Sequence, residues 1–293
     1  MRTAREAARV MIMIIDLSEN NTVTNWDEVK ENVEGVILRC AYRGYKYPTI
    51  KEDGNFKRYA QACNEKNIPL GIYFMSQAIT VAEAKEEAAY IAECARQYKT
   101  ALPLFIDSEW SGEKSRNGRA DSLPIDTRTV ITIAFLEEVK AQGFTPGVYA
   151  CESWFTEHLN YNALREYYIW VADYGENTGE ICSIISLPKY DLFQFTSKRK
   201  VPGVLKTIDC SVYPGQIPNP EPKELRTITG MPVLRKGATG TAVKIWQVII
   251  GVEPDGQFGP ITDKATRDFQ EKSLIAKDGA VGPQSWNKGI NSF

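Results

Sequence analysis

The sequence predicts an α/β barrel followed by a small, separate C-terminal domain, and two patterns carry this prediction. Up to Cys210, short apolar runs alternate with helical stretches, as is typical of parallel β-sheets. Beyond Pro214, a proline-rich stretch leads into a short unit with an internal repeat. The chain length of 293 residues agrees with two domains, because an average domain has about 150 residues.

Eight apolar runs have the length and composition of buried strands, and eight strands are enough to close a barrel. The first five runs are separated by helical stretches, whereas the last three have little helix between them. The expected strands are 10–15, 35–39, 69–75, 102–107, 146–150, 168–173, 192–196 and 205–210.

Helical spacing predicts four helices between these strands. The last, at 126–142, has Asp126 as its expected N-cap and is followed by Gly143, a common C-terminal signal. The other three are expected at 26–32, 56–66 and 81–98.

The four prolines from Pro214 to Pro222 predict an extended, semi-rigid linker. The chain then divides into a barrel domain at 1–215, a linker at 216–228 and a C-terminal domain at 229–293, called the tail below. Within the tail, Asp255-Gly-Gln-Phe-Gly-Pro260 returns as Asp278-Gly-Ala-Val-Gly-Pro283. Glycine allows a tight turn and proline begins the next helix, so each copy is explained by a turn alone. The doubling is nevertheless a more specific signature than one Asp-Gly pair.

Composition excludes several classes of protein. Lys and Arg number 35 against 37 Asp and Glu, a balance that argues against nucleic-acid binding. No apolar run approaches the ~18 residues that span a bilayer, so membrane insertion is not expected. The first apolar stretch ends at Asp16 without a cleavage site, so we expect no signal peptide and synthesis in the cytoplasm. The six cysteines form no Cys-x-x-Cys pair and are expected as free, mostly buried thiols.

Four acidic residues lie at the ends of predicted strands: Asp16, Asp107, Glu109 and Asp209. If the barrel closes, all four face one pocket at its carboxyl end. Crowded carboxylates raise one another's pKa, so one stays protonated as a general acid while others remain charged. Glycoside hydrolysis needs that division of labour. A single such acid often caps a loop or helix, but the set of four favours a catalytic site.

The only histidine, His158, restricts the chemistry further. Zinc enzymes that use several His ligands are excluded, and Ser or Cys nucleophiles usually need a His base. His158 lies in a segment that looks like a helix away from the strand ends. We therefore expect hydrolysis by carboxylates, without a metal or other cofactor.

Several motifs carry a family resemblance: Asp16-Leu-Ser18, Arg39-Cys-Ala-Tyr-Arg-Gly-Tyr45, Gly71-Ile-Tyr-Phe-Met-Ser-Gln-Ala78, Phe105-Ile-Asp-Ser-Glu109 and Trp170-Val-Ala-Asp-Tyr174. Together with 193–196 and 208–209, they resemble glycoside hydrolase family 25, the lysozymes (N-acetylmuramidases) of phages and bacteria. The resemblance covers about 10–215. It implies a (β/α)5β3 barrel that cleaves the β-1,4 bond between N-acetylmuramic acid and N-acetylglucosamine.

By similarity, Glu109 is the proton donor and Asp16, Asp107 and Asp209 are supporting carboxylates. Asp107 acts either as nucleophile or by orienting the substrate's N-acetyl group, and the sequence leaves both roles open. Two departures from the family pattern are Cys210-Ser211 after Asp209, where an Asn is common, and Phe195 in place of a Tyr. The expected substrate contacts are Tyr42, Tyr73, Trp110, Tyr149, Trp170, Tyr174 and Gln194. About half of the aromatic residues among them are expected to be ordinary packing residues.

The tail resembles the type 1 peptidoglycan-binding domain, a three-helix module that anchors proteins to cell walls. The matching residues include 233–237, Trp246-Gln247, both repeated turns, Phe269-Gln270 and Trp286. A generic three-helix domain is also compatible, since Trp246 and Trp286 are expected in its core.

Both parts therefore indicate a peptidoglycan hydrolase of the lysozyme or endolysin type, with the glycan strand in the barrel and wall polymer at the tail. The expected lack of a signal peptide favours a phage endolysin released by a holin over a secreted autolysin. One alternative is a non-catalytic wall-binding protein that keeps the barrel as a scaffold, which the four intact acids disfavour. Another is a glycosidase for chitin-like glycans, which leaves the tail unexplained.

Overall fold

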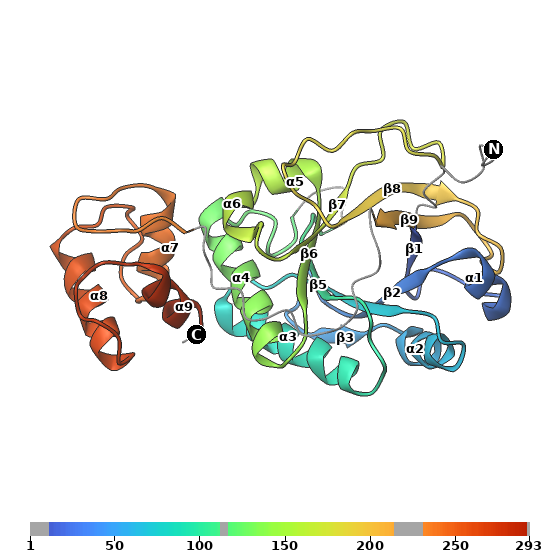
Figure 1. Cartoon of the computed structure of the whole chain (residues 1–293), viewed down its shortest axis with the longest axis horizontal. Helices are drawn as coiled ribbons and strands as arrows, with labels where there is room; N and C mark the ends of the chain where they lie inside the picture. The colour runs from blue at the N-terminus through green and yellow to red at the C-terminus, as the bar shows by residue number, and fades with distance from the viewer. Residues whose placement is uncertain (1–11, 112–116, 214–230, 292–293) are drawn as a thin grey trace, which may run out of the picture.

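The computed structural model describes residues 12–111, 117–213 and 231–291, so the linker expected at 216–228 lies outside the described residues. The larger part is a closed barrel with helices on its outside, and a group of three helices lies beside it (Figure 1). The predicted α/β barrel followed by a small helical domain is therefore confirmed.

The first and last strands close the barrel. β1 (Ile12–Leu17) is parallel to β2 (Gly35–Arg43) and antiparallel to β9 (Ile208–Tyr213). β9 also runs antiparallel to β8 (Leu192–Arg199), whereas the other described neighbours around the barrel are parallel. The remaining barrel strands are β4 (Leu70–Met75), β5 (Leu104–Asp107), β6 (Pro146–Cys151) and β7 (Tyr168–Ala172).

Two features of the sheet differ from the sequence prediction. β9 begins at Ile208 rather than Leu205, because the preceding residues form a turn in which Leu205 is 64% exposed. A short strand, β3 (Ile50–Glu52), pairs antiparallel with the end of β2 and forms a hairpin that the apolar pattern did not indicate.

Four helices cover the outside of the barrel close to their predicted ranges: α1 (Trp26–Asn32), α2 (Phe56–Glu65), α3 (Val81–Arg96) and α4 (Ile125–Ala141). Two short helices, α5 (Glu152–Glu157) and α6 (Tyr161–Leu164), lie between β6 and β7. α5 is the segment before His158 that was expected to be helical, whereas α6 was not predicted. None of the described helices is long and apolar enough to cross a membrane.

The ends of α4 test two specific predictions. Gly143 follows the helix with φ of 88°, a left-handed conformation that confirms it as the C-terminal signal. The prediction of Asp126 as N-cap is wrong, because Pro124 precedes the first helical residue, Ile125. Asp126 instead lies in the first turn, where its negative charge favours the helix N-terminus.

The barrel is filled where its strands begin. Ile14, Ile37, Phe105 and Leu192 form an apolar layer there together with Trp170, so the barrel is packed rather than hollow. This layer leaves the opposite end, where the parallel strands finish, for polar side chains. The six cysteines are free thiols, as predicted, and four of them are buried.

The tail consists of α7 (Thr241–Ile249), α8 (Pro260–Lys272) and α9 (Pro283–Asn291). Its core contains Trp246 and Trp286, which are both 0% exposed and pack edge to face with ring centroids 5.3 Å apart. Both tryptophans are therefore core residues, as expected.

A glutamine holds each of the repeated turns in the tail. Gln247 Nε2 donates to Asp255 Oδ1 at 2.7 Å, and its Oε1 accepts from Gly256 N at 2.8 Å. Gln270 makes the same pair of hydrogen bonds to Asp278 and Gly279, at 3.0 and 2.9 Å. The glycines have φ of 76° and 71°, which favours Gly over other residues. The doubled pattern thus encodes two equivalent glutamine-locked turns.

We expect Gln270→Ala to destabilise the tail by about 1–3 kcal/mol, because it leaves the buried Gly279 N–H without its acceptor. Gln257→Ala is the matched control, since Gln257 is exposed and Ala280 occupies the equivalent position in the second turn. Calorimetric unfolding of the full-length chain measures both changes. Equal effects of the two substitutions would contradict the proposed role of the glutamine.

Candidate active site

Four carboxylates meet at the end of the barrel where the parallel strands finish. Asp107 is the last residue of β5, and Glu109 follows two residues later. Asp16 in β1 is directly opposite Asp209 in β9 in the strand register. Because β9 runs antiparallel, its first residues lie at the end where the parallel strands stop. The structure therefore brings together all four predicted acids.

Burial and mutual repulsion raise the pKa of these carboxyl groups. Burial is the largest cause for Glu109, followed by the charge of Asp209, and together they raise its pKa to about 7. Burial, then Asp209, raises the pKa of Asp16 well above its usual value. Burial, then Glu109, does the same for Asp107. At neutral pH the cluster therefore retains protons, as a general acid requires.

Gln194 connects two of the acids with two tyrosines. Its Nε2 donates to Asp16 Oδ2 at 2.7 Å, and its Oε1 accepts from the hydroxyls of Tyr149 and Tyr174 at 2.8 and 2.7 Å. The Tyr174 hydroxyl also lies 3.3 Å from Asp209 Oδ1. Gln194 is 2% exposed, so its main observed role is to orient these groups.

The other predicted aromatic contacts lie at different depths. Trp170 is 2% exposed and donates from Nε1 to Ser211 Oγ at 3.0 Å, so it forms the floor beneath the acids. Its ring packs against Tyr149 and Tyr73, with centroids 4.5 and 6.3 Å away. Tyr42 and Trp110 are half-buried. Tyr42 is the second-last residue of β2, and Trp110 follows three residues after β5.

Arg39 in β2 places a positive charge beside the acids. It pairs with Asp53 at 2.8 Å and with Glu19 at 3.1 Å. Its charge opposes the increase in the pKa of Asp107, whose main causes are burial and Glu109. The sequence motif contained Arg39 but did not reveal this electrostatic role.

A buried tryptophan supports the segment that carries Asp107 and Glu109. Trp154 Nε1 donates to Ser108 Oγ at 3.1 Å, directly between Asp107 and Glu109 in the chain. The guanidinium of Arg128 in α4 lies 4.7 Å from the centre of the Trp154 ring. Arg128 is itself held by hydrogen bonds to the carbonyls of Ala120, Asp121 and His158. Sequence reasoning missed this support, because the residues are far apart in the chain.

His158 lies at the end of α5, where its ring packs against Trp154 and Trp110 at 4.4 and 5.0 Å. It therefore belongs to the aromatic support behind the acids. In the described parts of the chain, no group of three or more His, Cys, Asp or Glu residues is arranged to hold a metal ion.

One oxygen of the site is left without a partner. Asp107 Oδ1 is buried and has no hydrogen-bond partner among the described residues. Buried acceptors are normally satisfied, so this oxygen lacks a donor that its environment would be expected to supply.

Comparison with known proteins identifies the family. Residues 15–204 match the model of glycosyl hydrolases family 25. The modular autolysin LytC from Streptococcus pneumoniae, solved with a synthetic peptidoglycan ligand, is 25% identical with a TM-score of 0.59. That match covers 70% of this chain and 47% of LytC. The catalytic domain of the endolysin ply40 from a Listeria monocytogenes bacteriophage is 23% identical with a TM-score of 0.59, covering 72% of this chain and 96% of that domain.

A shorter part of the chain is similar to an enzyme of a different type. A zinc D-Ala-D-Ala carboxypeptidase from Streptomyces albus G is 38% identical over 63 residues. This match covers 19% of the present chain and 25% of the carboxypeptidase, so the chain spans a quarter of that relative and about half of LytC. The family match spans most of the barrel, including three of the four clustered acids, Asp16, Asp107 and Glu109. The chain therefore belongs to glycosyl hydrolases family 25.

Proposed function

We propose that this protein is a peptidoglycan hydrolase that cleaves the β-1,4 bond between N-acetylmuramic acid and N-acetylglucosamine. The observation that carries this proposal is Glu109, a carboxyl group with its pKa raised to about 7 among three further acids. Membership of family 25 and the likeness to an autolysin solved with a peptidoglycan ligand support the same substrate.

In the proposed mechanism, Glu109 in its protonated form donates a proton to the glycosidic oxygen as the bond to the anomeric carbon breaks. The transition state resembles an oxocarbenium ion, and neighbouring carboxylates stabilise its positive charge. Asp16 is held by Gln194 and Asp209 by Tyr174, so neither needs to reorient during the reaction.

Asp107 has two possible roles in a reaction of this type, as nucleophile or as a group that orients the substrate's N-acetyl arm. Its unpartnered Oδ1 favours the second role, because the amide N–H of an N-acetyl group is the donor that this oxygen lacks. We therefore propose that Asp107 aligns the acetamido oxygen for attack on the anomeric carbon.

For the tail we propose binding to wall polymer, based on its resemblance to the type 1 peptidoglycan-binding domain. Since Trp246 and Trp286 are fully buried, any such binding uses surface side chains. We further propose that the enzyme acts on the wall after release from the cytoplasm, as a holin would permit.

Glu109→Gln should lower the rate of glycan cleavage by about 10²–10⁴-fold, because the amide keeps the shape but cannot donate a carboxylic proton. Release of reducing sugar from purified cell walls measures this loss. Glu31→Gln is the matched control, since Glu31 is an exposed residue of α1. A Glu109→Gln enzyme with nearly full activity would overturn the assignment of the general acid.

Activity should fall as pH rises through about 7, because Glu109 then loses the proton that it must donate. Asp209→Asn removes a negative neighbour, which lowers the pKa of Glu109 and moves this decline to lower pH. The pH dependence of kcat/KM for both enzymes tests the prediction. A decline at the same pH in both would exclude the proposed coupling.

The isolated tail, residues 229–293, should sediment with purified peptidoglycan but release no reducing sugar. A sample spun without peptidoglycan controls for self-association. If the tail stays in the supernatant, wall binding is wrong, whereas the hydrolase assignment stands because it depends on the acids of the barrel.

A further inference from the structure

The outer helix α4 has no polar face toward solvent. Every residue from Arg128 to Glu137 is buried, although a helix on the outside of a barrel usually exposes a polar stripe. One side of α4 contacts the barrel strands β5 and β6. At its beginning, Arg128 lies over the ring of Trp154 in α5. Its opposite side therefore needs a cover from elsewhere in the chain.

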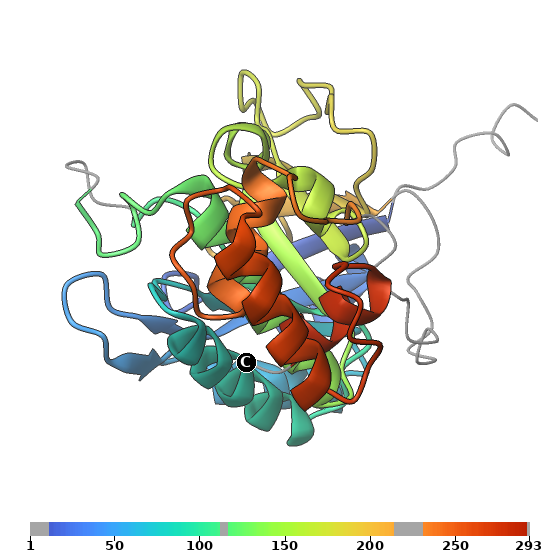
Figure 2. The ribbon, with the colours of Figure 1, turned by 90° about the vertical axis from the view of Figure 1, so that its left-hand side faces the viewer.

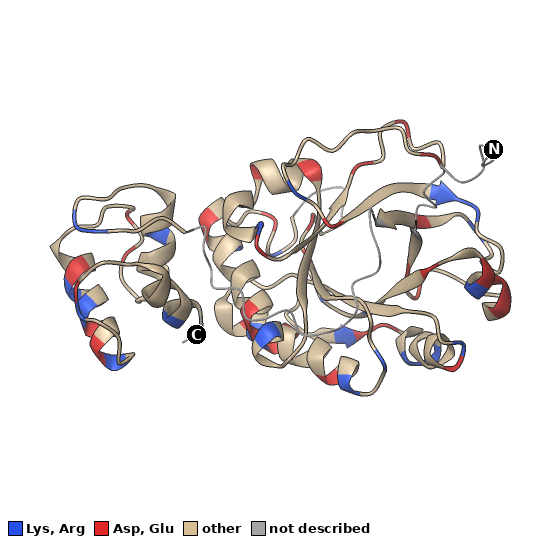
Figure 3. Cartoon of the chain, viewed as in Figure 1, with Lys and Arg blue, Asp and Glu red and all other residues tan. Residues whose placement is uncertain are grey.

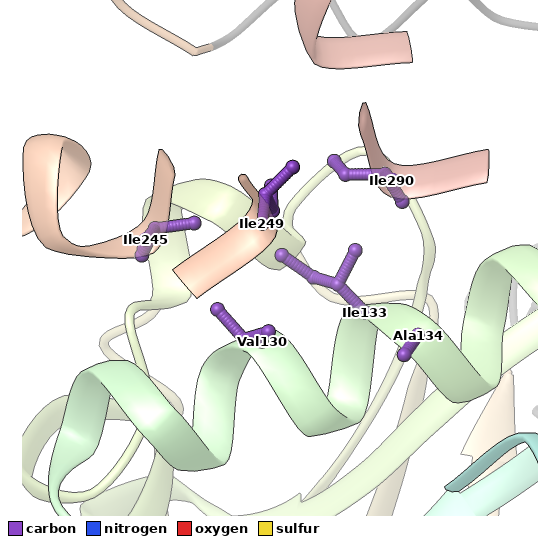
Figure 4. A pocket seen from close by; sticks show the side chains of 6 residues that line it. All are labelled: Val130, Ile133, Ala134, Ile245, Ile249 and Ile290. Carbon is purple, nitrogen blue, oxygen red and sulfur yellow. The ribbon is translucent and has the colours of Figure 1, made fainter. Parts of the chain in front are cut away.

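The tail supplies that cover with α7 and α9. Figure 4 shows isoleucines of these helices facing three apolar residues of α4 across a small pocket. The six residues that line this pocket, called the seam below, are Val130, Ile133 and Ala134 from α4 and Ile245, Ile249 and Ile290 from the tail. All six are buried, with exposures from 1% for Ile245 to 8% for Ile249.

The edge of the seam is polar. Asp126 in the first turn of α4 accepts a hydrogen bond from Thr241, the first residue of α7. The positive charge of Lys244 acts on the same carboxylate. Burial is the largest influence on the pKa of Asp126 and raises it, which agrees with a carboxylate partly covered by the tail.

Charged residues are concentrated on the remaining helix of the tail, α8. α8 carries Asp263, Lys264, Arg267 and Asp268, and it lies on the side of the tail away from the barrel (Figures 1 and 3). A view along the long axis shows the tail over the flank of the barrel (Figure 2). An apolar side toward α4 and a charged side toward solvent are typical of a docked domain.

We infer that α4 is an intramolecular docking surface and that the tail is seated on it as a fixed part of the molecule, rather than moving freely on its linker. The occupant is the α7–α9 face of this same chain. The short connection between the domains favours the contact, because it keeps the local concentration of the tail high. Docking does not depend on the proposed enzymatic activity.

Docking has one consequence for the proposed function. The helix that receives the tail also positions the support behind Glu109 through Arg128 and Trp154. If the tail binds wall polymer, a fixed seat sets its distance and direction from the cleavage site, which a freely moving tail would not do.

NMR relaxation of backbone ¹⁵N nuclei in the full-length chain tests the inference. In the wild type, amides of the barrel and the tail should share one rotational correlation time. A clearly shorter correlation time for the wild-type tail would overturn the inference without any variant.

Ile133→Asp places a charge in the seam and should release the tail, whose amides then tumble faster than those of the barrel. Ile261→Asp is the matched control, because Ile261 is 76% exposed on α8, and its tail should remain docked. Unchanged amide shifts in the barrel strands show that the Ile133 variant is folded. A tail that stays docked in folded Ile133→Asp, or that is also released in Ile261→Asp, would contradict the seam as the contact that holds it.

Discussion

Closure of the barrel by the antiparallel strand β9 is the constraint on which the rest of the site depends. β9 joins β8 to β1, and its register sets Asp209 opposite Asp16. Without this pairing, Asp209 would not contribute to the raised pKa of Glu109. The acids at this closed end of the barrel are buried, and desolvation is the largest cause of each raised pKa in the cluster.

Burying several acids close together costs folding free energy, and contacts with neighbouring residues offset part of that cost. Buried carboxyl groups with raised pKa values oppose folding as pH rises, since the folded chain retains protons that the unfolded chain releases. Gln194 and Arg39 offset part of this cost by a hydrogen bond to Asp16 and by a positive charge near Asp107. Trp154 anchors the segment between Asp107 and Glu109 from behind. The layer of contacts around the acids is thus as necessary to the site as the acids themselves.

The apolar pattern was sufficient to predict the barrel strands and the clustered acids, because both follow from local periodicity and from the position of charges at strand ends. It was insufficient for α6 and β3, which are too short for a periodic signal. It also missed the Arg128–Trp154–Ser108 support, whose members meet only through tertiary packing. Asp209 was expected at the end of a strand and lies near the beginning of an antiparallel one, which brings it to the same face. The apolar character of α4 is visible in the sequence, but its cover by the tail is not.

The central claim is that burial and neighbouring carboxylates keep Glu109 protonated near neutral pH. The most direct measurement is an NMR titration of the Glu109 side-chain carboxyl carbon in the full-length protein, assigned by its disappearance in Glu109→Gln. The expected result is a titration midpoint of about 7 for the Glu109 carboxyl group. A midpoint near the ordinary value of 4.5 would contradict the account, because Glu109 would then be charged at the pH where it has to donate a proton.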